Sequence, residues 1–274
     1  MSTADAIDDQ GFDVLTAKIA RERGFACGGY KPTCLKRRIA VRMRACGVHR
    51  YADYAQRLDS DRAEYDKLIE TLTINVTKLF RNPEAWAAVE RELWPALFAR
   101  SDRELRVWSA GCASGEEPYT LAISALRAAE AAGTPAAASR VRITASDIDV
   151  RSLERARDGA FAESAFGDEP NGARARWFEP GWPARATAAP RALIHVERRD
   201  LLEDAPPPGP WHLIVCRNVI IYFDRESQER LFRQFRDALA PGGFLVLGKV
   251  ETLLGETRAL FEVVNGRERF FRRP

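Results

Sequence analysis

The first eighty residues carry apolar side chains at the spacing of short amphipathic helices. Phe12, Leu15 and Ile19 lie three or four positions apart, and the same spacing recurs over 51–58 and 65–72. This is the period of helices that bury one face. The pattern predicts a compact all-helical domain over residues 1–81. Asn82-Pro83 is expected to end one helix and begin the next, and residues 82–104 to form a linker helix.

From Leu105 the pattern changes to short apolar runs that alternate with helical stretches. We expect strands at 105–109, 141–146, 193–197, 212–216 and 244–248, a strand pair near 260–272, and helices over 117–132, from 149 and over 225–239. This alternation predicts a doubly wound, Rossmann-like α/β sheet over residues 105–274. Residues 167–190, rich in Gly, Pro and Ala, are expected to be an irregular surface excursion, and Pro241-Gly242 a tight turn before the fifth strand.

Composition narrows the class of protein. The 274 residues, 46% of them hydrophobic, suit one large or two modest folded domains. Five cysteines without a C-x-x-C pair and three scattered histidines indicate neither a disulfide framework nor a metal site. No apolar run approaches 18 residues and the N-terminus has no apolar signal core, so we expect no membrane insertion and a cytoplasmic location.

The turn after the first strand indicates the chemistry of a cofactor. Small residues over 109–115 tolerate positive φ and let the backbone approach a ligand closely. A helix N-terminus attracts anions, so Glu116 and Glu117 there would repel a pyrophosphate. They suit a ligand that carries an ammonium, a sulfonium or ribose hydroxyls, and S-adenosylmethionine (SAM) carries all three. The missing G-x-G-x-x-G argues against a dinucleotide oxidoreductase.

Polar residues also follow the other strands, where an open α/β sheet binds its ligands. Asp147 is placed to accept hydrogen bonds from a ribose diol, while Asp149 is expected to cap the next helix. After the third strand, Asp200 can take an adenine amino group, and the leucines beside it, Leu201 first, can cover the ring.

The fourth strand ends in polar residues that interrupt a very apolar run. They are Arg217 and Asn218, with Tyr222 four residues after Asn218. All three could face one crevice, although a solvated loop with Tyr222 in the core is the alternative.

These residues and their order resemble a known enzyme family. Residues 105–249 resemble class I SAM-dependent methyltransferases. The segments 108–110 with 115–119, 145–149 and 216–224, together with the junction 72–81, are similar to the chemotaxis receptor glutamate O-methyltransferases, the CheR family. The resemblance covers about residues 12–272. It implies an N-terminal all-helical domain followed by a class I methyltransferase domain.

The resemblance also implies roles for individual residues. The cofactor contacts would be Asn75, Thr77, Arg81, Glu117, Asp147, Asp200, Leu201, Arg217 and Asn218. Arg81 and Tyr222 match residues beside the transferred methyl group, where they would position the acceptor carboxylate. The implied products are a glutamate methyl ester and S-adenosylhomocysteine. We expect the reaction to use no metal ion. A glutamate with a pKa of about 4.3 is already ionised at neutral pH, so no general base is required.

A basic stretch supplies a candidate surface for the acceptor. Between Lys31 and Arg50 lie seven basic residues and no acidic one, and Arg38 and Arg42 share a helix face. The resemblance implies that this helix binds the cytoplasmic helical domain of a chemoreceptor, with contacts from Arg37, Arg38, Arg42 and Arg44. A solvated face and nucleic-acid binding are the alternatives. We expect a monomer that binds no nucleic acid.

Several positions depart from the family pattern: Asp200 stands where Asn is usual, Ile74 and Lys78-Leu79 alter the junction, and Lys249-Val250-Glu251 replaces His-Ser-Glu. Some members of the family carry a small β-subdomain at the position of residues 167–190 that docks a receptor tail peptide. The segment is short here, so we do not expect a peptide tether.

Three alternative functions stay open. The first is a SAM-binding regulatory protein without catalysis. The second is a nucleic-acid methyltransferase, although the fourth strand lacks the Asn/Asp-Pro-Pro-aromatic loop of amino-group methylases. The third, a small-molecule methyltransferase, leaves the basic helix unexplained.

Overall fold

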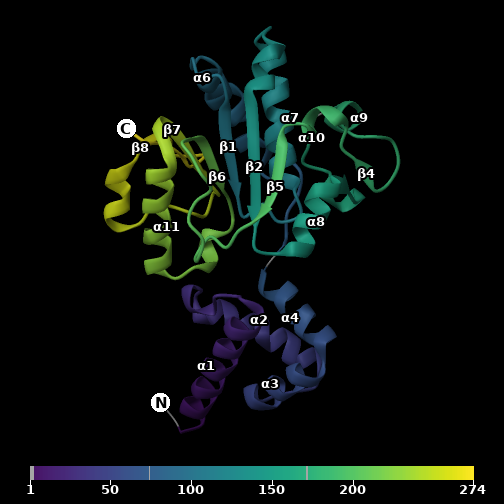
Figure 1. The fold of residues 1–274 in the computed structure, drawn as a ribbon, viewed down its shortest axis with the longest axis vertical. Coiled ribbons are helices and arrows are strands. Elements are labelled where there is room, and N and C mark those ends of the chain that lie inside the picture. The colour runs from purple at the N-terminus through teal and green to yellow at the C-terminus, as the bar shows by residue number, and fades with distance from the viewer. Residues whose placement is uncertain (1–2, 74, 171) are drawn as a thin grey trace. The chain divides into compact units, whose positions relative to one another are not determined.

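The chain forms two compact units (Figure 1). The computed structural model describes residues 3–73, 75–170 and 172–274. The first unit comprises Met1–Ile74 together with Tyr222–Gln228, and the second comprises Asn75–Ile221 together with Glu229–Pro274. A short segment far along the sequence therefore belongs to the N-terminal, helical unit. The predicted domain boundaries at residues 81 and 104 stay a prediction.

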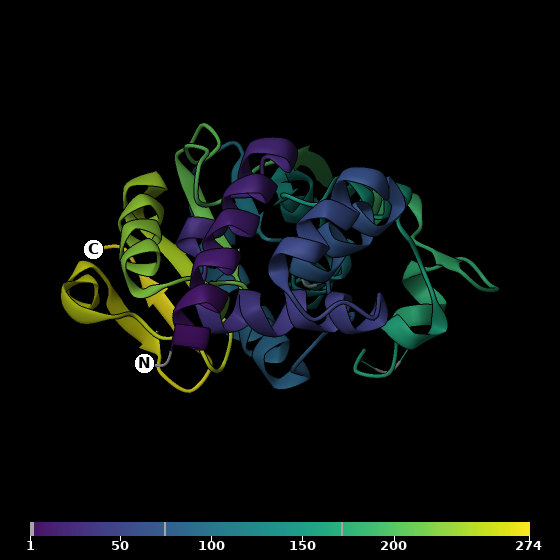
Figure 2. The same ribbon diagram turned by 90° about the horizontal axis from the view of Figure 1, so that it is seen from below.

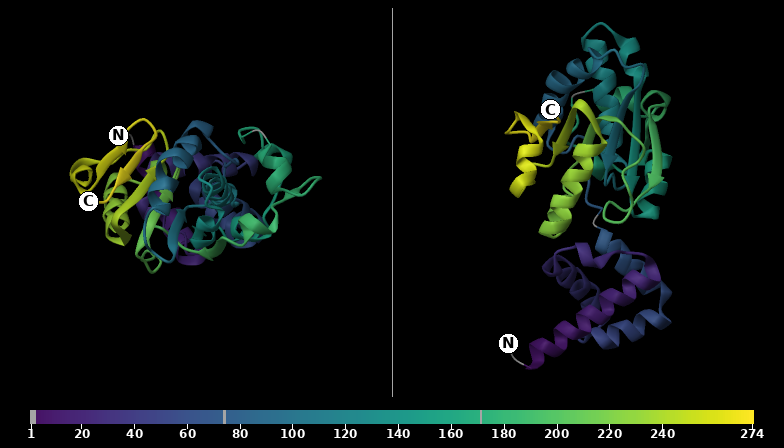
Figure 3. Two further views of the ribbon diagram at one scale, coloured as in Figure 1. Left: turned by 90° about the horizontal axis from the view of Figure 1, so that it is seen from above. Right: turned by 60° about the vertical axis from the view of Figure 1, so that its left-hand side comes forward.

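The helical unit is built from four α-helices: α1 (Thr3–Arg23), α2 (Pro32–Ala45), α3 (Tyr51–Ser60) and α4 (Arg62–Thr73). They appear in purple and blue in the right-hand view of Figure 3, where α1 packs against α3 and α2 against α4. The apolar faces meet inside, and Leu15, Ile19, Ile39, Tyr54 and Leu68 are completely buried. This confirms the all-helical N-terminal part that the hydrophobic period predicts.

The second unit contains a seven-stranded sheet in the order β5-β2-β1-β6-β7-β9-β8. Five strands are parallel, and the C-terminal hairpin adds two antiparallel ones. The strands are β1 (Leu105–Ala110), β2 (Val141–Asp147), β5 (Ile194–Arg198), β6 (Trp211–Cys216), β7 (Leu239–Leu247), β8 (Glu262–Asn265) and β9 (Phe270–Arg272). The predicted α/β sheet is confirmed. In the register Ser109 lies between Ala145 and Val215, so the carboxyl ends of the three central strands meet at one edge.

Helices flank this sheet (Figure 1). They are α5 (Pro83–Ala88), α6 (Trp94–Phe98), α7 (Glu116–Ala131), α8 (Val150–Asp158) and α11 (Arg225–Ala238), whose first turn counts with the helical unit. The left-hand view of Figure 3 looks down the axis of α7. Figure 2 shows the yellow C-terminal hairpin at one edge of the sheet and the green segment that contains α9 (Ala173–Trp177) near the other.

The helical region between the predicted domains differs from its expectation. Helix α4 ends at Thr73, so the expectation that Asn82-Pro83 ends a helix is wrong. Pro83 does begin α5, because its missing N–H falls where a first helical turn leaves donors unpaired. The helix expected over 82–104 is observed over 83–98, as α5, the π-helical turn η2 (Val89–Leu93) and α6 in direct succession.

Two later segments are also more ordered than expected. The excursion at 167–190 contains α9, and its two-residue strand β4 (Ala184–Arg185) pairs with β3 (Ala160–Phe161), before α10 (Ala188–Arg191). Pro241-Gly242 lies inside β7, at a register shift against β6, rather than before it. Backbone pairing with distant residues, which local composition does not report, explains both differences.

Candidate functional site

The turn between β1 and α7 requires its glycines. Gly111 and Gly115 have φ of +82° and +102°. A Cβ on Gly111 would lie 2.5 Å from Cγ2 of Val219, and one on Gly115 would lie 2.9 Å from Cα of Ala156. The turn therefore packs directly on the loop after β6 and on α8, and only residues without a side chain permit this approach.

Two neighbouring carboxylates at the start of α7 have different surroundings. Ser109 Oγ donates a hydrogen bond to Glu117 at 2.8 Å, and Ser114 Oγ donates one to Glu116 at 2.8 Å. Burial raises the pKa of Glu117 to about 7, against the opposing effect of the Arg217 and Arg81 charges. A buried carboxyl poised near neutrality gains from a cationic ligand, so Glu117 fits the positive end of SAM.

Asp147 connects the loops after β1 and β2. Its carboxylate accepts hydrogen bonds from the backbone N–H groups of Ala113 at 2.9 Å and Asp149 at 3.0 Å. Burial raises the pKa of Asp147 to about 6. Asp149 caps α8 by accepting from the Arg151 N–H at 3.1 Å, which confirms its expected capping role.

The junction segment is held against the same loops. Asn75 Nδ2 donates to Asp149 at 2.5 Å, and the Phe80 N–H donates to Thr120 Oγ1 at 3.0 Å. Phe80 and Asn82 have φ of +54° and +61°, so a left-handed residue stands on each side of Arg81. Such conformations persist only where surrounding contacts hold them. Thr77 lies partly buried in this segment, and Ile74 lies outside the described residues.

Arg217 ties the loop after β6 to the junction segment. Its Nη2 donates to the Arg81 carbonyl and to Asn82 Oδ1, both at 3.0 Å. Its guanidinium lies 5.1 Å from the Trp86 ring centroid. The buried Nε has no hydrogen-bond partner among the described residues. Burial lowers the pKa of Arg217, and the Glu117 charge opposes this change.

Glu251 organises the residues that follow Arg217, a role that the sequence analysis did not assign to it. Its carboxylate accepts hydrogen bonds from four backbone N–H groups, at distances of 2.7–3.0 Å. The donors are Asn218, Val219, Ile220 and Gly248. Asn218 has a φ of +62°, which Asn tolerates better than most residues. The only sequence signal was the acidic residue retained in Lys249-Val250-Glu251.

The residues after β5 form a self-capped turn. The Asp200 carboxylate accepts from the Leu202 N–H at 2.8 Å, while the Asp200 N–H donates to Asp204 at 2.8 Å. Burial raises the pKa of Asp200, and Leu201 is buried beside it. The structure thus brings Glu117, Arg81 and Arg217 into one electrostatic cluster and leaves Asp200 with local partners.

The four arginines predicted to bind the acceptor fall into two groups on α2. Arg37 and Arg44 are exposed. Arg42 instead binds the buried Glu64 through two hydrogen bonds, of 3.0 and 2.6 Å. Arg38 donates to the Thr71 carbonyl at 2.6 Å and lies against Tyr222, which belongs to the same unit.

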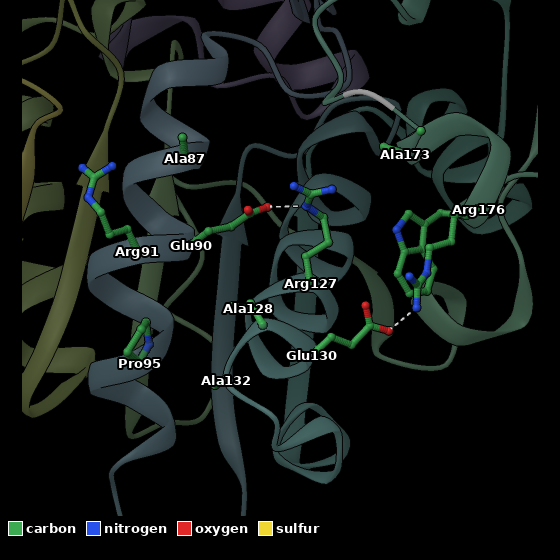
Figure 4. A pocket seen from close by; sticks show the side chains of 13 residues that line it. Ala87, Glu90, Arg91, Pro95, Arg127, Ala128, Glu130, Ala132, Ala173 and Arg176 are labelled. Atoms are coloured by element: carbon green, nitrogen blue, oxygen red, sulfur yellow. Dashed lines mark hydrogen bonds and ion pairs between the residues drawn. The ribbon is translucent and has the colours of Figure 1, made fainter.

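A separate surface pocket lies between α5–α6, α7 and α9 (Figure 4). Ion pairs link Glu90 to Arg127 at 3.0 Å and Glu130 to Arg176 at 2.5 Å along its wall. Its lining shares no residue with the predicted cofactor set.

Within residues 3–73, 75–170 and 172–274 there is no cluster of His, Cys, Asp and Glu suited to a metal ion, and no helix is long and apolar enough to cross a membrane.

Comparison with known proteins identifies both units. Residues 75–270 match the family described as "CheR methyltransferase, SAM binding domain", and residues 10–73 match "CheR methyltransferase, all-alpha domain". The Chemotaxis protein methyltransferase of Listeria innocua is 36% identical over 242 residues, covering 88% of this chain and 89% of the relative. That of Escherichia coli (strain K12) is 31% identical over 262 residues, covering 90% and 85%.

Two other similarities are of more limited extent. An uncharacterized 104.1 kDa protein of Rhodobacter capsulatus is 36% identical over 245 residues, but the chain spans only 25% of its length. The crystal structure of a SAM-dependent methyltransferase from Mesorhizobium loti aligns with a TM-score of 0.29 and 22% identity, covering 56% of this chain and 51% of that one. On the match of both family domains, this chain belongs to the CheR methyltransferase family and is a SAM-dependent methyltransferase.

Proposed function

We propose that this enzyme methylates glutamate side chains on the cytoplasmic helical domain of a chemoreceptor. The observation that carries the proposal is the cluster of Glu117, Arg81 and Arg217, in which a buried carboxyl with a pKa of about 7 lies near two guanidinium groups. The carboxylate suits a cationic methyl donor, and the Arg81 guanidinium suits an anionic acceptor.

The cofactor contacts proposed from the sequence fit this arrangement. Glu117 would meet the positive charge, Asp147 the ribose hydroxyls, and Asp200 with Leu201 the adenine. Asn75, Thr77, Arg217 and Asn218 would complete the set. When bound, SAM supplies a methyl group on a positively charged sulfur, which a carboxylate oxygen can accept without a prior proton transfer.

The protein's task is therefore placement rather than proton transfer. The acceptor glutamate is ionised at neutral pH, and its oxygen forms the new bond to the methyl carbon while the carbon–sulfur bond breaks and its electrons stay on sulfur. The products are a methyl ester and a neutral thioether, S-adenosylhomocysteine. Arg81 and Tyr222 would hold the carboxylate in line, and orientation of this kind contributes roughly 7–11 kcal/mol in well-aligned systems.

Recognition of the acceptor is proposed for the exposed basic face of α2. Arg37 and Arg44 are the accessible members of the predicted set. Their charge complements an acidic helical surface, and the effect is greatest at low ionic strength.

The test is incubation of the purified enzyme with methyl-labelled SAM and membranes of the source cell that contain its chemoreceptors. We expect base-labile label in a receptor-sized band. The Arg81→Ala variant should lose that label. Label in RNA, or none with the native enzyme, contradicts the proposal.

A further inference from the structure

We propose that the helical unit positions Tyr222, through Arg38 and the backbone before α2, and so couples receptor recognition to methyl transfer. The inference rests on the proposed function. It assigns Arg38 as a positioning residue rather than a receptor contact.

The backbone around Tyr222 is bound to the segment that leads into α2. The Lys31 N–H donates to the Tyr222 carbonyl at 2.9 Å, and the Asp224 N–H donates to the Gly29 carbonyl at 2.9 Å. Between them, Tyr30 and Phe223 form an antiparallel bridge. Their rings pack edge to face with centroids 5.1 Å apart. Residues 222–224 therefore lie alongside residues 29–31 as a short strand-like pair.

The side chain of Tyr222 is held by Arg38, from the second turn of α2. The Arg38 guanidinium lies 5.5 Å from the centroid of the Tyr222 ring. The same guanidinium donates from Nη1 to the Thr71 carbonyl at 2.6 Å, near the end of α4. Its buried Nε has no hydrogen-bond partner among the described residues. One side chain thus joins α2, the end of α4 and the proposed methyl-site tyrosine.

The first and the later residues of the loop after β6 are held by contacts in different units. Asn218, Val219 and Ile220 are fixed by Glu251 within the sheet unit. Tyr222 and the residues after it group with the helical unit. The residue proposed to orient the acceptor is therefore held by the unit proposed to bind that acceptor. Receptor docking on α2 can act on Tyr222 through Arg38 and Lys31, without any change in the cofactor contacts.

The exposure of the arginines supports this division of roles. Arg37 and Arg44 are exposed and accessible to a receptor surface, while Arg38 is half-buried and its guanidinium contacts Thr71 and Tyr222 inside the unit. Arginine suits this task because its planar group binds an oxygen and stacks on a ring at the same time.

A double-mutant cycle tests the coupling. Arg38→Ala, Tyr222→Phe and the double variant are made in the full chain and assayed with labelled SAM and chemoreceptor-containing membranes. We expect Arg38→Ala to lower kcat by about 10- to 100-fold, as for loss of alignment at a reacting centre, with the SAM Kd within about twofold. The double variant should be no slower than Tyr222→Phe alone, because Arg38 is proposed to act only by positioning the Tyr222 hydroxyl, which that variant already lacks.

Two results would overturn the inference. One is an Arg38→Ala enzyme whose kcat is native and whose receptor KM alone is raised, since Arg38 would then be a receptor contact. The other is a double variant whose losses multiply. If Arg38→Ala fails to fold, as judged by thermal unfolding, Arg38→Lys replaces it. Lysine keeps the charge but cannot bind Thr71 and Tyr222 together, so a native kcat for it also overturns the inference.

The controls separate this inference from the proposed function. Arg21→Ala removes an arginine that is 71% exposed on α1 of the same unit and should behave as the native enzyme. Arg44→Ala should raise receptor KM more than it lowers kcat. Native enzyme that transfers no base-labile methyl group refutes the function itself, whereas native transfer with an unaffected Arg38→Ala refutes only the role of Arg38.

Discussion

The Glu251 carboxylate accepts a hydrogen bond from the Asn218 backbone N–H at 2.9 Å. Three more backbone N–H groups, two from the same turn and one from Gly248, donate to the same carboxylate. The turn that contains Asn218, a residue with a φ of +62°, is therefore built around a buried anion. Hydrogen bonds to a charged acceptor are stronger than neutral ones, so this carboxylate holds the turn firmly.

Replacing Glu251 should weaken SAM binding although Glu251 is not itself a proposed SAM contact. In Glu251→Gln one acceptor oxygen becomes an NH₂ group that faces N–H donors, which leaves buried groups unsatisfied at a cost of about 1–3 kcal/mol. We expect the SAM Kd, measured by calorimetry, to rise about tenfold or more, together with a lower unfolding temperature. Glu256→Gln, at a side chain that is 97% exposed, is the matched control. Native SAM affinity in Glu251→Gln would show that the turn needs no anion.

SAM affinity should depend on pH near neutrality. The pKa of Glu117 is raised to about 7, so its carboxyl is largely protonated below that pH and ionised above it. A cationic ligand prefers the ionised form, so affinity should rise between about pH 6.5 and 8. Stability of the free enzyme should change in the opposite sense. A raised carboxyl pKa means that the folded state holds the proton more tightly, so this group's contribution falls as pH rises from about 4.5 to about 7.

The Glu117→Gln variant isolates this effect. It should bind SAM more weakly above about pH 7, the difference should shrink at lower pH where the native carboxyl is also neutral, and its own affinity should be flat over the same range. Asp147, with a pKa of about 6, leaves a residual dependence only at lower pH. A native enzyme with a flat profile across neutrality would contradict the assignment of Glu117.

Gly111→Ala should lower the free energy of unfolding far more than the same substitution at Gly133. The new Cβ would lie 2.5 Å from Val219 Cγ2, on the turn that Glu251 holds, and the residue would keep a φ of +82°. Gly133→Ala is the matched control, since its φ is +66° and no heavy atom lies within 4 Å of the added Cβ. We expect about 1 kcal/mol of destabilisation for Gly133→Ala and about 2–4 kcal/mol for Gly111→Ala, measured by urea unfolding. An equal loss of unfolding free energy in the two variants would mean that the turn shifts to accommodate the added side chain.

Arg42 should matter for folding, and Arg37 for the receptor. Arg42→Ala leaves Glu64, whose side chain is 4% exposed, without its cationic partner. Loss of one member of a buried pair costs about 3–5 kcal/mol, so the free energy of unfolding should drop accordingly. Arg37→Ala, at an exposed position, should change it by less than about 0.5 kcal/mol and raise the receptor KM. If Arg42→Ala has native stability and a raised receptor KM, Arg42 is a receptor contact and this prediction is wrong.

Local patterns account for most of the fold. The apolar period of 12–72 predicts helices because each buries one stripe, and the alternation from Leu105 predicts the sheet because its strands are buried on both faces. The capping role of Asp149 was equally predictable from the sequence, since a cap depends on residues only two or three positions away. Where the expectation was wrong, as at 75–82 and inside 167–190, the decisive partners were distant: Thr120 for Phe80, and Ala160–Phe161 for β4.

The sequence by itself determined the class of the protein, the order of its elements and the set of polar residues that follow its strands. These features depend on hydrophobic period, turn chemistry and motif spacing, all of which act over a few residues. Only the tertiary structure decided that Glu251 binds the backbone of the Asn218 turn, that Arg42 pairs with Glu64, and that Arg38 lies against Tyr222. Those pairs lie far apart in the chain, and the need to satisfy buried charges and N–H groups, rather than any local pattern, selects them.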